Sequence, residues 1–568
     1  MLRIGYVLVL FCCIFPILPG MLGLIAPSLN YIPALGLHDF SFSGFRAVFA
    51  WPSVSHSIVQ TIFTAIISTL MASLIAFLII QTYWGKRSWH KVEHLLSPLL
   101  ALPHVAFAVG FLFLFSNTGW LARGIYFIAH DVFSLSHQTA QSIYKIQDHS
   151  VIGLTFALAI KETPFLLLMS IPILNNLNVS QCLRVSQSLG YSVSQTWWKV
   201  IFPQWWRHMR FPLFSIMAYS ASVVDVSLIL GPTHIPTFAV LIWQWFNEPD
   251  LELLPRAAAG AFLLFVLCSL LIGLVWLLER VFLSCYRSWM TSGCQLSSTS
   301  NNARFQYIFH ILATISLFTL AVILVWTFAL RWKFPDFLPT FWSLRFWQSE
   351  WPYIQSTIFT SFSLALVSSF LALLLAITAL EYRQHYRLSV PLFVIALPML
   401  LPQLSLLFGL QITSLWFDPD SYWLWVMWSH VFFAFPYVYL SLDGPWQSYP
   451  TRLSQTAVSL GFSPFKTFTT VKLRTLAGAI AFAWAMGASV SLAQYLPTLM
   501  LGSGRVTTLT TEAVALSSGQ DRRITALYAL WQAILPFGFF VSALIMNRHF
   551  YRRMKGSQSE NQKGQMTV

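Results

Sequence analysis

The chain has 568 residues, of which 57% are hydrophobic, 16% aromatic and 9% charged, and its formal net charge is +14. Soluble domains carry about 25% charged residues, so this composition excludes a soluble enzyme, a disordered chain and a coiled coil. The surplus of Lys and Arg suits the cytoplasmic loops of a membrane protein and does not by itself indicate nucleic acid. We therefore expect an all-α polytopic membrane protein.

The predicted membrane helices follow one another along the whole chain. A spanning helix needs about 20 mostly apolar residues. Two of the predicted segments, 151–174 and 211–231, are apolar but contain charges, and the other ten contain no Asp, Glu, Lys or Arg. The first segment is too long for a signal-peptide core, so we predict a retained helix. The ten uncharged segments lie between Arg3 and Asp39, Arg46 and Lys86, Glu93 and Arg123, Arg256 and Glu279, Arg304 and Arg331, Glu350 and Glu381, Arg387 and Asp418, Asp420 and Asp443, Arg474 and Arg505, and Arg523 and Arg548.

The basic residues predict how the chain is oriented. With the N-terminus inside, alternate loops place 22 Lys and Arg residues on the cytoplasmic side and 10 on the outer side. This bias follows the positive-inside rule and predicts that both termini are cytoplasmic and that the number of helices is even. The ten residues predicted outside are Arg46, Arg123, Lys145, Arg256, Arg331, Lys333, Arg345, Arg505, Arg522 and Arg523.

Several sequence features occur twice in the same order. Pro103 precedes Gly110 by seven residues, and Pro402 precedes Gly409 by the same distance. A Trp-Pro pair followed by an Ile-Phe-Thr triplet also occurs in both halves of the chain. Parallel repeats are typical of transporters. We predict about twelve helices in two parallel six-helix halves, 1–287 and 305–547, with a cytoplasmic linker at 288–304 and a basic cytoplasmic tail at 548–568.

The longest predicted cytoplasmic loops, near 181–203 and 452–474, occupy equivalent places in the two halves. Each consists of a short helical piece, a glycine that permits a turn (Gly190 or Gly461), and a second helical piece. Either glycine alone would be an ordinary helix C-cap, but the matched pair favours docking to another protein. An apolar stripe suited to such docking is predicted in each loop, formed by Leu183, Leu189, Trp197 and Ile201 and by Leu453, Leu460, Phe465 and Phe468.

The spacing of these loops resembles the EAA loop of ABC-importer permeases, E-A-A-x3-G-x9-I-x-L-P. The triplet positions hold Arg184-Val185-Ser186 and Gln455-Thr456-Ala457, and the glycines are Gly190 and Gly461. Pro203 matches the final proline, whereas Arg474 occupies that position in the second loop, and both glutamates are absent. The resemblance covers nearly the whole chain and points to the YnjC-type fused double permeases, which are related to the fused ferric-iron and thiamine permeases.

The resemblance implies a type I importer permease fold (MetI-like) in each half and a location in the bacterial inner membrane. Each EAA-like loop would dock on one of two cytoplasmic ABC ATPase subunits, and a periplasmic or extracellular solute-binding protein would deliver a small polar solute. The chain has no GxxxxGK[ST] phosphate loop, so we expect a permease subunit without catalytic residues, cofactors or a nucleic-acid partner. Ferric iron and thiamine are suggested by kinship alone.

Four polar residues in the predicted membrane helices are candidates for the translocation path, namely Lys161, Glu162, Asp225 and Gln494. A charge at the bilayer centre costs about 2.5–3.5 kcal/mol on insertion scales. Adjacent residues of a helix do not face each other, so Asp225 rather than Glu162 is the expected partner of Lys161. A translocation path and a structural ion pair that fixes helix packing are equally open interpretations.

Two other functions compete with an ABC permease. A twelve-helix facilitator driven by an ion gradient also has parallel halves, but the stretch from Gly85 to Lys91 lacks the Asp and the spacing of that family's loop motif. A membrane enzyme would need a convergent catalytic set, which the sequence does not show. The six cysteines form no CxxC motif and the histidines no HExxH, so no metal site is expected, and His104 is expected to be a packed residue.

Overall fold

The computed structural model describes residues 2–129, 150–293, 305–386, 392–395, 397–519 and 521–565. It is mostly helical, which confirms the all-α part of the expected fold class. Within these residues the strands are β1 (Ala329–Arg331) and β2 (Phe341–Trp342), which pair antiparallel. Most of the predicted linker, residues 294–304, lies outside the described residues, and the helix before it continues to Thr291, beyond the predicted boundary at 287.

The first part of the chain, up to residue 291, contains long, medium and short helices in the residues that the structure describes. Pro33, Pro203 and Pro255 each lie in the first turn of a helix, where the missing N–H needs no partner. In chain order the elements are α1 (Leu2–Cys13), α2 (Ile17–Ser28), η1 (Pro33–Leu35), α3 (Ser43–Ala50), α4 (Val54–Tyr83), α5 (Trp89–Ala101), α6 (His104–Phe115), α7 (Trp120–Phe127), α9 (Ile152–Asn176), α10 (Val179–Ser188), α11 (Val193–Thr196), η3 (Trp197–Ile201), α12 (Phe202–Ser222), α13 (Asp225–Leu230), α14 (Phe238–Phe246), η4 (Leu251–Leu253) and α15 (Leu254–Thr291).

The second part of the chain repeats much of this order. Besides β1 and β2 its elements are α16 (Gln306–Phe328), α17 (Arg345–Tyr386), α18 (Leu392–Ile395), α19 (Leu397–Leu400), α20 (Gln403–Ser414), η6 (Pro419–Ser421), α21 (Tyr422–Gln447), α22 (Thr451–Ser459), α23 (Pro464–Thr467), η7 (Phe468–Lys472), α24 (Leu473–Thr475), α25 (Ala477–Leu492), α26 (Leu496–Leu501), α27 (Leu509–Ser517) and α28 (Arg522–Gln565). The predicted tail from residue 548 continues α28.

Within the described residues, eight helical segments are long and apolar enough to cross a membrane: Leu2–Ser28, Val54–Tyr83, His104–Phe127, Ile152–Asn176, Leu251–Thr291, Gln306–Phe328, Arg345–Tyr386 and Arg522–Arg548. The pair Pro464–Thr475 and Ala477–Leu492 passes the same test together but is bent by 76°. The twelve spans expected from the sequence therefore stay a prediction. One predicted helix is wrong in detail, because segment 211–231 breaks at Val223 and Val224, and Asp225 opens the separate helix α13.

An early helix of each part of the chain packs against a helix of the other part. α2 packs on α20, and α16 packs on α6, so each contacts a helix from the other part of the chain. Glycine permits both crossings: a Cβ on Gly409 would lie 1.6 Å from the Gly20 carbonyl oxygen, and a Cβ on Gly110 would lie 2.6 Å from that of Thr319. Gly110 and Gly409 are the glycines that follow the repeated prolines in the sequence.

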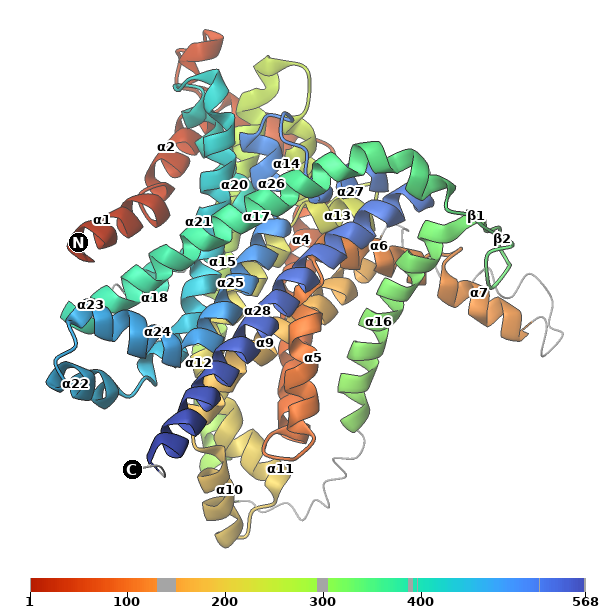
Figure 1. Cartoon of the computed structure of the whole chain (residues 1–568). Coiled ribbons are helices and arrows are strands. Elements are labelled where there is room, and N and C mark those ends of the chain that lie inside the picture. The colour runs from red at the N-terminus through yellow and green to blue at the C-terminus, as the bar shows by residue number, and fades with distance from the viewer. Residues whose placement is uncertain are drawn as a thin grey trace.

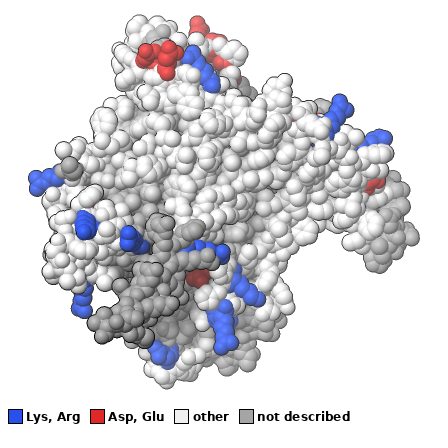
Figure 2. All heavy atoms as spheres, in the orientation of Figure 1, with Lys and Arg blue, Asp and Glu red and all other residues white. Residues whose placement is uncertain are grey.

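The bundle has charged ends and an apolar middle. In Figure 1, α10 and α22 lie toward the lower left near the C-terminus, whereas α7, β1 and β2 lie at the right. Figure 2 shows a broad surface without charged side chains between the basic groups of these two ends. This distribution is the one that a bilayer requires, because a charged side chain in the hydrocarbon region is costly.

Candidate functional site

The two EAA-like loops have the same backbone geometry. α10 ends shortly before Gly190 and α22 shortly before Gly461, with φ angles of +84° and +86°. The next helix of each loop is capped by a serine: Ser192 Oγ accepts the N–H of Gln195, and Ser463 Oγ accepts that of Lys466, both at 3.3 Å. A π-helical turn, η3 or η7, follows in each loop. The equivalent positions are 271 residues apart throughout.

The residues at the EAA positions occupy the same places in the two loops. Arg184 and Val185 are exposed while Ser186 is buried, and Gln455 and Thr456 are exposed while Ala457 is buried. The third position therefore holds a small side chain in both loops. Pro203 lies in the first turn of α12, whereas Arg474 lies inside α24.

The prediction of an apolar stripe is wrong for the first loop, whereas in the second loop Leu453, Leu460 and Phe465 are exposed and Phe468 is partly exposed. Trp197 and Ile201 are buried in the core with the first turns of α12, because η3 feeds directly into that helix. The exposed apolar side chains lie around the glycines instead: Leu189 is 62% exposed, Leu460 75% and Phe465 77%. Each loop thus presents a small apolar surface at its tip, anchored by aromatic packing at its base.

A central cavity of about 150 Å³ lies between the two parts of the chain. Lys161, Glu162, Asp225 and Gln494, the four residues predicted for a translocation path, all line it. The walls are formed by α5, α6, α9, α12 and α13 of the first part and by α19, α20, α21, α25 and α26 of the second part. Residues from both parts of the chain thus share one polar space inside an apolar bundle.

Glu162 is held by a histidine. His104 Nε2 lies 2.9 Å from Glu162 Oε1, and the Glu162 side chain is 9% exposed. The His104 ring also contacts Tyr219, with ring centroids 5.0 Å apart. His104 is thus packed against Tyr219, as expected, and in addition forms a half-buried polar pair with Glu162 on the cavity wall.

Lys161 has a different partner from the one expected. Its Nζ donates to the Leu99 carbonyl oxygen at 3.1 Å, and no ion pair with Asp225 is present among the described residues. Asp225 does not lie on the continuous helix that was predicted. It is the first residue of α13, which begins after the helix is interrupted at Val223 and Val224. The prediction that Lys161 and Glu162 do not pair with each other holds, because they bond to separate groups.

The cavity contains polar residues that the sequence did not single out. Gln403 Nε2 donates to Gln494 Oε1 at 2.7 Å, and the hydroxyl-bearing rings of Tyr219, Tyr437 and Tyr495 also line the space. One sequence signal could have pointed to Gln403, and to His104 as its equivalent. His104 follows Pro103 as Gln403 follows Pro402, so the repeated prolines each introduce a polar residue at the start of a helix.

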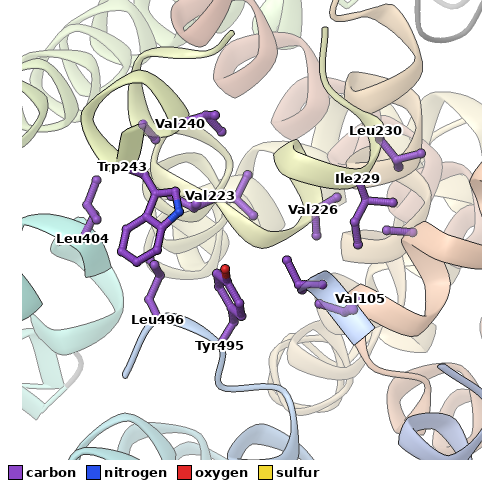
Figure 3. Packing of buried hydrophobic residues seen from close by; sticks show 14 of the residues in the cluster. Val105, Val223, Val226, Ile229, Leu230, Val240, Trp243, Leu404, Tyr495 and Leu496 are labelled. Carbon is purple, nitrogen blue, oxygen red and sulfur yellow. The ribbon is translucent and has the colours of Figure 1, made fainter. Parts of the chain in front are cut away.

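An apolar cluster closes one side of the cavity. Figure 3 shows Trp243 and Tyr495 side by side, with Leu404 and Leu496 next to them and Val223 behind. The ring centroids of Trp243 and Tyr495 are 6.3 Å apart. Val223, Tyr495 and Leu496 also line the cavity, so the same residues form its wall and its apolar cover.

Comparison with known proteins shows the family to which the chain belongs. No protein-family model matches the chain. It is 33% identical over 536 residues to the inner membrane ABC transporter permease protein YnjC of Escherichia coli (strain K12), and the match covers 93% of each chain. The chain belongs to the ABC transporter permease family. The permease is also 24% identical over 520 residues to the thiamine transport system permease protein ThiP of Haemophilus influenzae, covering 87% of the permease and 89% of ThiP.

Membership of this family confirms the resemblance inferred from the loops. With its apolar helices, the permease is a multi-pass inner-membrane protein. Both relatives are named as permeases rather than enzymes. Among the described residues no group of three or more His, Cys, Asp and Glu side chains is arranged to hold a metal ion.

Proposed function

We propose that the permease is the membrane subunit of a binding-protein-dependent importer whose two EAA-like loops dock on two cytoplasmic ATPase subunits. The matched geometry of the loops at Gly190 and Gly461 is the observation that carries this proposal. Each loop exposes apolar side chains at its tip, and exposed apolar patches commonly mark interaction surfaces. ATP hydrolysis would be supplied by the docked subunits.

The proposal includes two six-helix halves, 1–287 and 305–547, each with a type I importer fold. It is supported by pairs of equivalent elements 271 residues apart: α13 and α26 each have six residues, and α14 and α27 each have nine. In this arrangement the loops and both termini face the cytoplasm, and a solute-binding protein docks on the opposite face.

The central cavity is the proposed solute path, with Lys161, Glu162, Asp225 and Gln494 in its wall. Two carboxylates and three tyrosine rings favour a small polar solute that carries positive charge, because carboxylates pair with cations and aromatic faces attract them. The ammonium group of Lys161 already donates to the Leu99 carbonyl oxygen. The relative ThiP is named for the transport of thiamine, and a compound of this chemical class suits the cavity.

The test combines purification with one pair of variants. Co-purified ATPase subunits should hydrolyse ATP faster when the solute and its binding protein are added. Replacing Gly190 and Gly461 together by Trp should abolish that stimulation while the permease still inserts into the membrane, because the left-handed turns at the loop tips are lost. Gly85→Trp is the matched control, since Gly85 also has a positive φ and open space around it but lies in another loop.

Two outcomes would contradict the proposal. One is normal stimulation in the double glycine variant. The other is solute uptake that survives ATP depletion and collapses with a proton uncoupler, which would indicate a transporter driven by an ion gradient.

A further inference from the structure

A second pocket lies beside α7, β1 and β2, away from the EAA-like loops. It has a volume of about 400 Å³ and forms where the turn between α6 and α7, the end of α16 with β1, and the start of α28 meet. Four arginines line it, namely Arg123, Arg331, Arg522 and Arg523, together with a single carboxylate, Asp521. Figure 1 shows this region at the right, beside α7 and the hairpin.

Two of the arginines meet at one threonine. Arg123 Nε donates to the Thr118 carbonyl oxygen at 3.0 Å, and an Arg522 terminal nitrogen donates to Thr118 Oγ1 at 2.9 Å. Arg123 is 2% exposed, and its other contacts are to the carbonyl oxygens of Lys333 and Asp336 at 2.7 and 2.9 Å. Two like charges are thus held close together by neutral acceptors.

The acidic groups nearby do not balance these charges. The Asp521 carboxylate is paired with Arg523, because each of its two oxygens accepts a hydrogen bond from the Arg523 guanidinium group at 2.8 Å. Asp336 lies close to Arg123 and attracts it. Neither Arg123, Arg331 nor Arg522 forms an ion pair with a carboxylate in the part of the chain that the structure describes. Among the described residues that line the pocket, four arginines stand against the single carboxylate of Asp521, and even with Asp336 near Arg123 and Glu350 near Asp521 the arginines remain in excess.

This excess is unusual for its place in the protein. If the EAA-like loops are cytoplasmic, as proposed above, the pocket lies on the outer side, where Lys and Arg are normally depleted. Four of the ten basic residues predicted outside line this one pocket. Arg123 is buried, which is costly for a cation, and three further arginines surround the same space, so this concentration indicates that an anion from elsewhere completes the site.

The surroundings indicate where the anion comes from. Trp326 and Trp332 stack beside the arginines, with Arg522 5.6 Å above the first ring and Arg123 4.8 Å above the second. Tryptophan is enriched at the depth of lipid headgroups. Below the pocket α16 exposes Leu317, Phe318 and Leu324, an apolar surface along which acyl chains can lie. Guanidinium groups bind phosphate through paired hydrogen bonds.

We propose that this pocket binds the phosphate group of an anionic phospholipid, with the headgroup between Arg331 and Arg522 and the acyl chains along α16. Arg123, which is saturated by carbonyl oxygens, contributes its charge and positions Thr118. Arg331 is exposed and Arg522 half-buried, so both are accessible to a ligand that enters from the membrane.

The test measures the unfolding temperature of the full-length permease in detergent with three probes: dioctanoyl-phosphatidylglycerol, dioctanoyl-phosphatidylcholine and inorganic phosphate. Phosphatidylglycerol should raise the unfolding temperature most, at concentrations at which the other two have little effect. In the double variant Arg331→Gln and Arg522→Gln the apparent affinity for phosphatidylglycerol should fall at least about tenfold. Gln at position 522 keeps a donor for Thr118. The matched control Arg345→Gln removes an exposed cation of the same end outside the pocket, and its response should equal that of the unaltered protein.

Three results would overturn the proposal: equal responses to the two lipids, an undiminished response in the double variant, or an equal response to inorganic phosphate, which would make the pocket a site for a free anion. If the double variant does not fold, Arg331→Glu alone replaces it, because the exposed Arg331 side chain forms no ion pair among the described residues. The comparison of the three probes on the unaltered permease needs no variant and is independent of transport.

Discussion

Gly190 and Gly461 adopt nearly identical left-handed conformations, with φ angles of +84° and +86°, although they are 271 residues apart. The triplet positions differ at every residue, since Arg184-Val185-Ser186 stands against Gln455-Thr456-Ala457, although a Ser-Leu pair directly precedes both glycines. The shared features are the glycine, the serine cap two residues later and the π-helical turn. The backbone shape of the loops is therefore repeated more faithfully than their side chains.

The left-handed turn at Gly461 can be tested with a single methyl group. A Cβ at Gly461 would meet no heavy atom within 4 Å, so the cost of Gly461→Ala is backbone strain alone, about 1–2 kcal/mol. We expect a lower unfolding temperature and weaker ATPase stimulation. Gly273→Ala in the helix α15 is the control, because it also meets no atom within 4 Å and alanine favours a helix. Equal effects of the two substitutions would contradict the strain argument.

Two hydroxyl groups on α4 should differ sharply in their contribution to stability. Thr61 Oγ1 accepts the N–H of Phe238 at the start of α14 at 2.9 Å, whereas the Thr64 hydroxyl, which is equally buried, has no hydrogen-bond partner among the described residues. Thr61→Val leaves a buried N–H unsatisfied and should destabilise the permease by about 1–3 kcal/mol. Thr64→Val should be neutral or slightly stabilising, as measured by thermal unfolding.

The equivalent contact in the second part of the chain supplies an independent check. Ser361 Oγ accepts the N–H of Leu509 at the start of α27, also at 2.9 Å. Ser361→Ala should therefore destabilise the permease as Thr61→Val does. If both variants unfold at the temperature of the unaltered protein, these hydroxyl groups do not hold α14 and α27 in place.

Glutamine should be able to replace His104 as the hydrogen-bond partner of Glu162. His104→Leu removes the donor and leaves the buried Glu162 unpaired, which should cost about 1–3 kcal/mol and reduce solute uptake. His104→Gln should retain more of both properties, because the equivalent position 403 already holds a glutamine. The control is Glu93→Gln, which alters a carboxylate outside the cavity. Identical uptake by the Leu and Gln variants would argue against a role for the hydrogen bond.

Acid should weaken the contact between Asp521 and Arg523. Burial raises the pKa of the Asp521 carboxyl, but hydrogen bonds from Arg523 and from the backbone outweigh it, so the pKa lies below its usual value of 3.8. A lowered pKa in the folded state contributes stability above the unfolded-state value, and this contribution is lost as the pH falls through the folded-state pKa. The unfolding temperature should therefore drop between about pH 4 and pH 2. The unfolding temperature of the Asp521→Asn variant should drop less over that interval. An equal drop would mean that other groups cause the effect.

The EAA-like loops show how far local sequence information reaches. The signals in these loops are local: a glycine, with a serine or proline nearby, between two short helical pieces. Each loop has the helix, turn and helix that these signals predict. The apolar stripe could not be predicted correctly, because η3 directs Trp197 into the core while the equivalent position in the second loop, Phe468, remains partly exposed. Whether an apolar residue faces a partner or its own core depends on the neighbouring helices.

Composition and the lengths of the apolar segments determined by themselves that this chain is a helical membrane protein, because a bilayer requires saturated backbone hydrogen bonds and few charges. Paired motifs in the sequence also indicated the permease family. Only the tertiary structure decided that His104 bonds to Glu162, 58 residues away, that Lys161 donates to Leu99 rather than pairing with Asp225, and that four arginines from three separate segments share one pocket. Such contacts depend on which faces of distant helices meet, and local spacing carries no information about that.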